Sequence, residues 1–520
     1  MIKDKFAHLL NGNYSLDSLE IASIQHEIDA ETLAIDALQP VAIDELQFKL
    51  KSHESKRREY KSLLSPLRRG IVPPEILGEI FQYAVERYYP VNRVGLVCKS
   101  WRDIALTTPS LWQTVIAPPG NAPINVKKLQ TWTARAGTLP KRVEIVGLNA
   151  IYECGCFYDD ICRLASPELA RFLTSGPVLD EVTIECYNHH CLDRLLGLIK
   201  SDENTLRPSW DSIRHLALEM GDVSFGLEWP FLNSLPQAVS SLLLETPWLR
   251  SVPSEDLPAL PPLDCLTKLH IVNDWPNSWI LRTLGSYRNL EEVVLGSAKF
   301  PRPFEVFNEV FTPVLLPKLQ VLRFRYMHHH FEDTRMLRCL RMPALKTLEV
   351  QYQDPSNADD SEGPCDTPDK SELYSDILHM LSGADGVVDL KQLHLEHLPI
   401  TSKGLLRILA ILPSLTFLEL AKIDVDRELF AMAREVDKPL LPLLRHLKIH
   451  DKFGAFDVDD VCQYLEGRKA STTEVEPDCV ERLDMTFKKR RLPRDSRPDE
   501  SVRAMELRGV GVLVNIGFSD

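Results

Sequence analysis

Leu415-Thr416-Phe417-Leu418-Glu419-Leu420 is the stretch that decides the fold, because its apolar-x-x-apolar-x-apolar pattern recurs along most of the chain. Apolar residues that alternate over a few positions are typical of a strand with one buried face. The central apolar residues of successive copies lie 24 to 36 residues apart, except for an interval of 45 from Leu348 to Leu393. The copies fall at Leu179/Val182/Ile184, Ile213/Leu216/Leu218, Val239/Leu242/Leu244, Leu266/Leu269/Ile271, Leu290/Val293/Leu295, Leu319/Leu322/Phe324, Leu345/Leu348/Val350, Leu390/Leu393/Leu395, Leu415/Leu418/Leu420, Leu444/Leu447/Ile449 and Val480/Leu483/Met485. This recurrence predicts a protein that grows by repeating one structural unit.

The segments between the copies show helical spacing, as at Leu405, Leu406 and Leu409. One strand and one helix per unit, at intervals near about 20–29 residues, are typical of a leucine-rich-repeat solenoid. The asparagine or cysteine that usually follows the strand is mostly missing, so we expect irregular turns. The sequence predicts an α/β fold, in which N-terminal helices and a small helical domain precede an irregular leucine-rich-repeat solenoid over residues 176–520. Residues 116–175 are predicted to hold a transition and a first irregular repeat.

An acidic stretch at residues 353–372 accounts for the one long interval between copies. It mixes seven acidic residues with Ser, Pro and Gly. Such a segment buries too little apolar surface to offset the entropy lost on ordering. We therefore expect Asp354 to Lys370 to be disordered and to lie outside the solenoid.

Residues 1–65 read as a charged helical lead-in. Ile21, Ile24 and Ile28 begin an apolar seam at steps of three and four, and Pro40 interrupts the helix because proline lacks a backbone donor. A weaker seam resumes beyond the proline. Two interpretations stay open at this stage, a coiled coil that associates with another chain and a helical hairpin that folds back on itself.

Residues 66–115 form a different unit of three short helices. Pro73 and Pro74 suit the first turn of a helix, and Glu75 favours its positive end. Apolar residues from Ile76 to Val85 predict one helix, residues from Val94 to Ala105 predict a second, and Pro109 starts a third turn. Three short helices bury little core, so we expect this unit to be marginal without a partner.

Three ordered blocks of this unit carry a family resemblance. Val72-Pro73-Pro74-Glu75-Ile76-Leu77, Val97-Cys98-Lys99-Ser100-Trp101-Arg102 and Pro109-Ser110-Leu111-Trp112 resemble an F-box, in the form common in mushroom-forming fungi. The lead-in Leu64-Ser65-Pro66-Leu67-Arg68-Arg69 and the leucine-rich array resemble the flanking parts of the same family. One departure is Val72, which stands where the family usually has leucine, with Gly70-Ile71 inserted ahead of it.

The resemblance implies a non-catalytic adaptor subunit of a ubiquitin ligase. The F-box would dock on a Skp-type adaptor and through it on a cullin, while the repeats would bind a protein target whose identity the sequence does not give. The alternative is an interaction scaffold with the same fold that recruits no cullin. The residues expected in adaptor docking, or in the core beneath it, are Pro73, Ile76, Leu77, Ile80, Trp101, Leu111 and Trp112.

The target is expected on the exposed face of the predicted sheet. In each strand the positions between the apolar template residues point away from the core. These positions carry basic and histidine side chains, namely Arg323, Arg325, His394, Lys448 and His450. An acidic or phosphorylated target would complement them. The alternative is that this face carries charge only to stay solvated.

Charge and hydrophobicity along the chain limit which partners and which location in the cell are expected. The net charge of −14 gives no electrostatic reason for the chain to bind nucleic acid or an anionic membrane. The first residues lack the apolar core of a secretory signal, and no apolar run reaches the length of a membrane span, so a cytoplasmic location is expected. Lys488-Lys489-Arg490-Arg491 is either a nuclear import signal, which would add a nuclear location, or a solvated loop.

Metal and catalytic motifs are not expected in this chain. Cys154, Cys156 and Cys162 belong to one predicted unit, whereas the cluster around Cys186 and Cys191 with two histidines belongs to another. This spacing favours buried reduced thiols over a zinc site. The run His328-His329-His330 favours a solvated turn or part of the target surface. Walker, nucleophile-elbow and H-E-x-x-H motifs are absent from the sequence, and Gly509-x-Gly511 lacks a third glycine, so no cofactor, no metal and no catalysis are expected.

Overall fold

The computed structural model of the chain describes residues 18–37, 43–63, 72–85, 91–117, 124–146, 162, 164–201, 208–222, 230–246, 257–272, 276–296, 312–327, 336–353, 370–382, 388–423, 426–435, 440–452, 458–471, 480–488, 502–509 and 512–519. The chain divides into two compact units. The first unit holds Met1–Pro118 and Asn125–Glu144, and the second holds Pro119–Ile124 and Ile145–Asp520.

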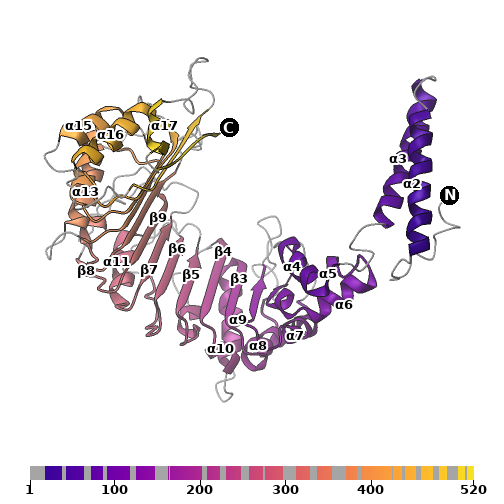
Figure 1. Cartoon of the computed structure of the whole chain (residues 1–520). Coiled ribbons are helices and arrows are strands. Elements are labelled where there is room, and N and C mark those ends of the chain that lie inside the picture. Colours follow the sequence, from indigo (N-terminus) through magenta and orange to yellow (C-terminus); the bar gives the residue numbers. More distant parts are fainter. Residues whose placement is uncertain are drawn as a thin grey trace. The chain divides into compact units, whose positions relative to one another are not determined.

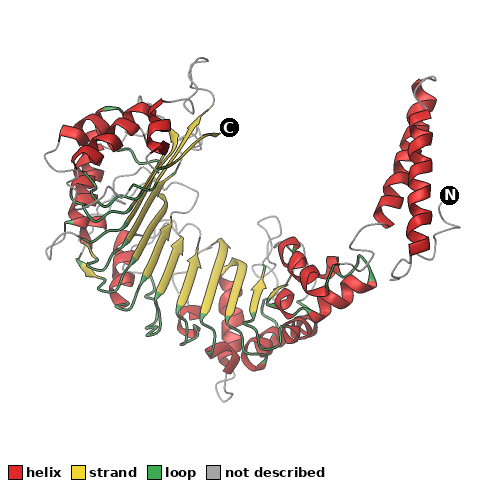
Figure 2. Cartoon of the chain, in the orientation of Figure 1, coloured by secondary structure: helices red, strands yellow, loops and turns green. Residues whose placement is uncertain are grey.

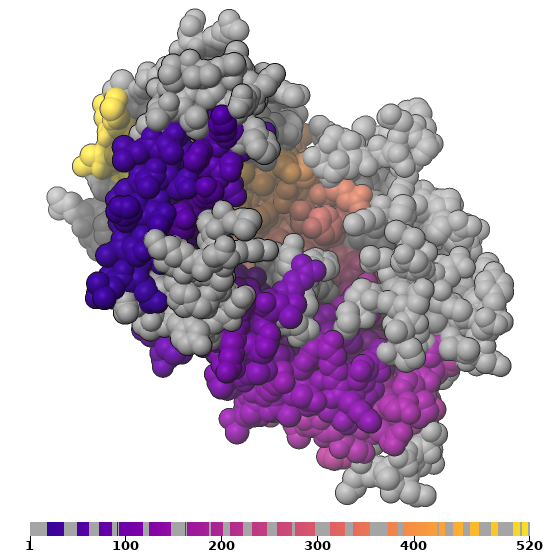
Figure 3. All heavy atoms as spheres, turned by 90° about the vertical axis from the view of Figure 1, so that its right-hand side faces the viewer, coloured from indigo at the N-terminus to yellow at the C-terminus, as the bar shows by residue number. Residues whose placement is uncertain are grey.

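The first described elements of the first unit are two helices, α2 (Ser18–Ala37) and α3 (Ile43–Leu63), that lie side by side (Figure 1). Their atoms carry the indigo end of the colour scale in Figure 3. Ile24 and Ile28 of α2 and Tyr60 of α3 are buried. Lys56 of α3 lies 3.1 Å from Glu31 of α2, and His53 contacts the same carboxylate. Of the two interpretations left open for the lead-in, the structure adopts the helical hairpin.

The rest of the first unit alternates short helices with two short strands. Its elements are α4 (Pro74–Ala84), α5 (Val91–Val94), α6 (Lys99–Thr107), the 3-10 turn η1 (Pro109–Trp112), β1 (Thr114–Ala117), α7 (Val126–Arg135) and β2 (Arg142–Ile145). Pro74 begins α4, as its fixed backbone angle favours. The continuous helix predicted from Val94 to Ala105 is wrong, because α5 ends at Val94 and Cys98 caps a new helix by accepting the backbone N–H of Trp101 at 3.5 Å.

The second unit is an α/β repeat built on one long parallel sheet (Figure 2). Its strands follow one another in chain order, and a separate short pair, β8 (Val314–Leu315) and β10 (Leu340–Arg341), lies beside it. The strands of the second unit in this sheet are β3 (Glu181–Asn188), β4 (His215–Asp222), β5 (Ser241–Glu245), β6 (Lys268–Val272), β7 (Glu292–Gly296), β9 (Val321–Met327), β11 (Thr347–Tyr352), β12 (Gln392–Glu396), β13 (Phe417–Ala421), β14 (His446–Lys452), β15 (Arg482–Lys488) and β16 (Leu513–Ser519).

Helices and 3-10 turns connect the strands and cover one face of the sheet (Figure 2). They are α8 (Pro167–Ser175), α9 (His189–Ser201), α10 (Pro208–Asp211), η3 (Pro230–Ser234), α11 (Asn277–Ser286), η4 (Met336–Cys339), α13 (Lys370–Leu381), α14 (Ser402–Ala410), α15 (Glu428–Glu435), α16 (Val458–Ser471) and α17 (Val502–Gly509). Successive helices from α13 to α17 pack on one another. This stacking is the arrangement expected of a solenoid, in which each unit contacts its neighbours.

The apolar template positions form the core of the second unit. Leu348 pairs in register with Leu322 on one side and Leu393 on the other, and all three side chains are fully buried. Because the pairing is parallel and unshifted at these positions, equivalent residues stack along the sheet. The predicted fold class, N-terminal helices followed by a solenoid of strands and helices, is confirmed.

The turns after several strands explain how the repeats manage without the usual asparagine or cysteine. Tyr326, His397 and Lys422 stand two residues beyond the last template position and adopt φ of +56°, +55° and +51°. The backbone N–H of His397 donates to Ala421 O, and that of Lys422 donates to His450 O, each at 3.0 Å. Backbone groups of neighbouring units thus satisfy one another where a side-chain ladder would otherwise do so.

Some of the features predicted from the sequence lie in parts of the chain that the structure does not describe. Residues 354–369 of the acidic stretch, His328 to His330, Cys154, Cys156 and Lys489 to Arg491 lie outside the described residues. Among the cysteines that the structure describes, Cys162, Cys186, Cys191 and Cys462 are buried, Cys98 and Cys339 are half-buried, and Cys265 is exposed. In the described part of the chain, no helix is both long and apolar enough to cross a membrane.

Candidate partner-docking surfaces

Helix α4 has two apolar faces with different surroundings. Leu77 and Phe81 are 3% and 1% exposed and form the core of the first unit, whereas Ile76 and Ile80 are 46% and 45% exposed. Tyr83, one turn further on, is 89% exposed. Residues four apart share a helix face, so Ile76, Ile80 and Tyr83 form an apolar stripe that the first unit leaves open to solvent.

The core beneath this stripe holds the other predicted docking residues. The indole N–H of Trp112 donates to Ala105 O at 2.7 Å, and the rings of Phe81 and Trp101 lie 4.8 Å apart. Leu111 and Trp112 are buried, and Trp101 is half-buried against the same cluster. Leu77, Leu111 and Trp112 therefore support the surface, while Pro73, at the start of α4, is exposed.

Close packing fixes α4 against the turn that follows α6. A Cβ added at Gly78 would lie 3.1 Å from Thr108 Oγ1 and 3.2 Å from Thr108 Cγ2, which is tighter than normal contact. Thr108 is itself held by a 2.7 Å hydrogen bond from its hydroxyl to Ile104 O. Gly78 permits this close approach, so the direction in which Ile76 and Ile80 face is set by the buried side of the same helix.

Between residues 91 and 107, three more large apolar side chains are exposed, and the sequence analysis does not single them out as docking residues. Leu96 is 75% exposed, Val97 is 60% exposed and Leu106 is 39% exposed. Val97 was assigned to the buried face of a continuous helix, and the break before Cys98 turns it outwards. Gly95 was the available signal, because glycine commonly ends a helix. Ile76, Ile80, Tyr83, Leu96, Val97 and Leu106 are called the α4–α6 apolar set below.

The second candidate surface is the sheet face that the helices of the second unit leave uncovered. Between the template residues of β9 to β15, one side chain per strand lies in a single row across the sheet. Paired residues in this row alternate in charge type: Arg323 with Glu349, Glu349 with His394, His394 with Glu419, Glu419 with Lys448, and Lys448 with Asp484. We refer to these six residues as the charge row.

Each of the five predicted target-binding residues lies beside a carboxylate on this face. Arg323 Nε lies 3.1 Å from Glu349, Arg325 Nε lies 3.7 Å from the same residue, and Arg323 also contacts Glu292. Glu419 serves the other three: His394 Nδ1 at 3.3 Å, His450 Nε2 at 3.3 Å and Lys448 Nζ at 3.9 Å. The face is therefore balanced in charge rather than basic.

These contacts shift the titration of the central pair. Burial opposes the charge of His394, but the carboxylates of Glu396, 3.9 Å from Nε2, and Glu419, 3.3 Å from Nδ1, outweigh it and raise the pKa of His394 to about 9. Hydrogen bonds from His394 and His450 hold the pKa of Glu419 well below its usual range. His394 is thus a cation and Glu419 an anion at neutral pH, so the row carries full charges.

The same row is mainly uncharged over the first strands of the sheet. Thr183, Ala217, Leu243 and Val294 occupy it on β3, β4, β5 and β7, paired in register through β6. His270 of β6 is the exception, and burial lowers its pKa to about 4, with Arg325 adding to the effect. This one row therefore joins an uncharged half, over the first strands, to a half of paired charges.

A third group lies where β3 ends and α9 begins. His189, His190 and Asp193 place one ligand atom each within 4.8 Å of one another. Burial, with a contribution from neighbouring His190, lowers the pKa of His189 to about 4. The structure also brings Cys162 against Cys191, whose hydrogen bond lowers the pKa of Cys162 to about 6. These two cysteines, which the sequence assigns to separate units, therefore lie in contact.

Comparison with known proteins identifies the domain that carries the first of these candidate surfaces. Residues 70–117 match the F-box-like family, which confirms that the three sequence blocks belong to an F-box-like domain. The first unit therefore contains an F-box-like domain, and the α4–α6 apolar set lies on it.

Comparisons with other proteins add little. One similar solved structure is titled "Crystal structure of TLR13-ssRNA13 complex", with 14% identity and a TM-score of 0.34, covering 70% of this chain and 41% of that chain. At this TM-score the likeness carries no argument about function. A search of curated proteins gave no significant match.

Proposed function

We propose that this protein is a substrate-recognition subunit of a Skp-cullin-F-box ubiquitin ligase. The observation that carries the proposal is the open apolar stripe of Ile76, Ile80 and Tyr83 on an F-box-like domain. Contiguous exposed apolar side chains of this size mark protein–protein interfaces. The stripe lies directly above a small core, so binding an adaptor there would extend that core.

The proposed mechanism requires no chemistry from this chain. The F-box-like domain docks on the Skp-type adaptor, which connects to a cullin and to the ubiquitin-charged enzyme. We propose that the solenoid is a leucine-rich-repeat array that holds the target, so that a target lysine is present at a high effective concentration near that enzyme. Rigid stacking of the repeats, with template residues fully buried, keeps the target at a defined distance along the array.

The adaptor arm is tested with variants on the exposed face of α4 alone. Ile76→Asp with Ile80→Asp puts two charges on the apolar stripe without touching Leu77 or Phe81, and is expected to abolish binding of a purified Skp-type adaptor. Met505→Asp is the matched control, because Met505 is 52% exposed on α17 in the second unit, and it should bind the adaptor normally. Wild-type adaptor affinity in the double variant would exclude this surface.

A cullin recruited through the adaptor distinguishes a ligase from a scaffold. Full-length protein mixed with adaptor and cullin is expected to form a ternary complex on a sizing column. Adaptor binding without cullin recruitment would favour a non-ligase interaction scaffold. The two results are separable because both are read from the same mixture.

We further propose that the target binds the exposed sheet face around the charge row. Arg325, at 41% side-chain exposure, and Lys448, at 29%, offer the most accessible charges among the three basic residues Arg323, Arg325 and Lys448. Because every predicted basic residue is paired with a carboxylate, a matching target presents charges of both signs rather than acidic groups alone.

This target arm is tested by affinity purification with the ligase inhibited. Arg325→Gln with Lys448→Gln removes two charges with little change in shape and is expected to reduce target capture by about tenfold or more. Arg445→Gln is the control, because Arg445 is 59% exposed and pairs with Glu481 away from the row. Adaptor co-purification should stay unchanged in all variants. Unchanged target capture by the double variant would exclude the sheet face as the target-binding surface and would favour the loops.

A further inference from the structure

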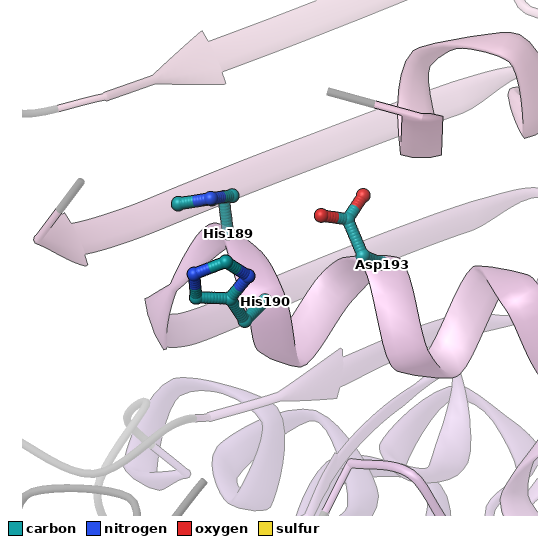
Figure 4. A group of neighbouring side chains, drawn as sticks. All are labelled: His189, His190 and Asp193. Carbon is teal, nitrogen blue, oxygen red and sulfur yellow. The ribbon is translucent and has the colours of Figure 1, made fainter. Parts of the chain in front are cut away.

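The strand-to-helix turn between β3 and α9 brings together two imidazoles and a carboxylate. His189 and Asp193 are four residues apart and share one side of the helix, and His190 is three residues from Asp193. Figure 4 shows His189 and Asp193 rising on one side of α9 with His190 in front. One ligand atom of each residue lies within 4.8 Å of the others.

The chemistry of this group is that of a metal site. The two imidazole rings are 4.0 Å apart between centroids, and His189 is 1% exposed. An imidazole nitrogen is a common ligand of divalent transition metals, and two such rings lie side by side here. The positive end of α9 opposes a cation, and the carboxylate of Asp193 supplies the negative charge that offsets it.

Asp193 is held in place from a separate element. The backbone N–H of Phe231, in η3, donates to Asp193 Oδ1 at 2.9 Å. Ligating carboxylates commonly have such a supporting hydrogen bond, because it fixes their orientation. One oxygen is oriented by the backbone, and the second remains for a bond to metal.

We propose that His189, His190 and Asp193 bind a divalent transition-metal ion of the zinc class. Zinc bonds to nitrogen and oxygen of about 2.0–2.2 Å place two tetrahedral ligands about 3.4 Å apart. The ligand atoms lie within 4.8 Å of one another, so the proposal requires the side chains of the half-buried His190 and Asp193 to rotate to this closer spacing. Three protein ligands leave a fourth position for water or for a side chain of a partner. This site is independent of adaptor docking and of the charge row.

The test is a titration of the full-length, thiol-reduced protein with Co²⁺, which reports its ligands by absorption. We expect one equivalent to bind with visible bands of nitrogen and oxygen ligation and to be displaced by Zn²⁺. Asp193→Asn keeps an oxygen for the Phe231 N–H but loses the charge, and should weaken binding by about tenfold or more. His190→Gln should do the same.

Two controls separate this site from adventitious binding. His215→Ala removes an exposed histidine on β4 and should leave Co²⁺ affinity unchanged. Replacing His328, His329 and His330 with alanine should also leave it unchanged. Equal melting temperatures of metal-free Asp193→Asn and wild type establish that the variant is folded.

Three outcomes would overturn the proposal. These are wild-type Co²⁺ affinity in both Asp193→Asn and His190→Gln, loss of binding in the His328–His330 variant, and a thiolate-to-metal charge-transfer band, which would assign the ion to cysteines such as Cys162 and Cys191.

Discussion

The F-box-like domain and the repeat array differ in the kind of side chain that they expose to solvent. The domain exposes large apolar side chains, with Tyr83 at 89% and Leu96 at 75%. The array buries its apolar template residues, and its uncovered sheet face exposes charges that contact one another, as Arg323 contacts Glu349 at 3.1 Å. The exposed apolar side chains can be removed from water only when a partner binds. The charges of the row already form ion pairs within the array.

Core size explains this difference. The domain has a single cluster that includes Leu77, Phe81, Ile104 and Trp112, while the array repeats its buried triples along the whole sheet. A small unit buries so little apolar surface that its free energy of unfolding is low without a partner. A stack of repeats gains stability from each added neighbour. We therefore expect the two units to respond differently to mutation, pH and partner.

The largest expected effect is from Phe81→Ala. Phe81 is 1% exposed and packs on Trp101, so its truncation should destabilise the first unit by about 3–5 kcal/mol. Hydrogen exchange should then show loss of protection over 72–117 with the array unchanged. Ile80→Ala on the exposed face should cost under about 1 kcal/mol without adaptor. Loss of protection in both units at once would show that the first unit does not unfold separately from the array.

Within the array, Glu419→Gln is the next largest change. Glu419 contacts His394, Lys448 and His450, so removing its charge leaves three basic groups close together. The expected loss is about 1–3 kcal/mol by urea unfolding. Glu481→Gln is the control: its pair with Arg445 is exposed on both sides and should contribute less than about 1 kcal/mol. Equal effects of the two variants would mean that the row adds no more than a surface ion pair.

A pH series should give a smaller effect that depends on His394 alone. The folded pKa of His394 is raised to about 9, above the ordinary value of 6.5, so its contribution is full below pH 6.5 and is lost as pH rises through 9. The urea midpoint of wild type should fall over this window more steeply than that of His394→Gln. His215→Gln, at an exposed site on β4, should keep the wild-type slope. Parallel slopes for wild type and His394→Gln would contradict the assignment.

Most of the strands and the F-box-like domain can be predicted from short, contiguous stretches of sequence. The template triples predict their strands because alternation over six residues is sufficient to define a buried face, and Leu418 and Leu420 are buried as expected. The F-box-like blocks are also contiguous, so a match needs no tertiary information. The fold could therefore be predicted from spacing alone.

The site residues depend on contacts that spacing does not contain. Ile76 and Leu77 are adjacent and equally apolar, and only packing against Trp101 and Thr108 decides which one faces inwards. Glu349 lies 45 residues from His394, yet strand register sets them side by side. A basic face was predicted because the carboxylates opposite each base become visible only once the register is known.

The smallest expected effect concerns the strand-end turns that replace the usual side-chain ladder. Tyr326 has φ of +56° and is 54% exposed, so its side chain adds backbone strain and little burial. Tyr326→Gly should raise the free energy of unfolding of the array by up to about 1 kcal/mol, because glycine adopts this conformation without steric cost. Tyr326→Val should lower it by about 1 kcal/mol, since a β-branched side chain tolerates positive φ least. Urea unfolding of both variants checks the sign, and protection of residues 72–117 should not change. Equal stability of the glycine and valine variants would show that the turn relaxes to another conformation, and that the backbone bonds between neighbouring repeats do not hold it.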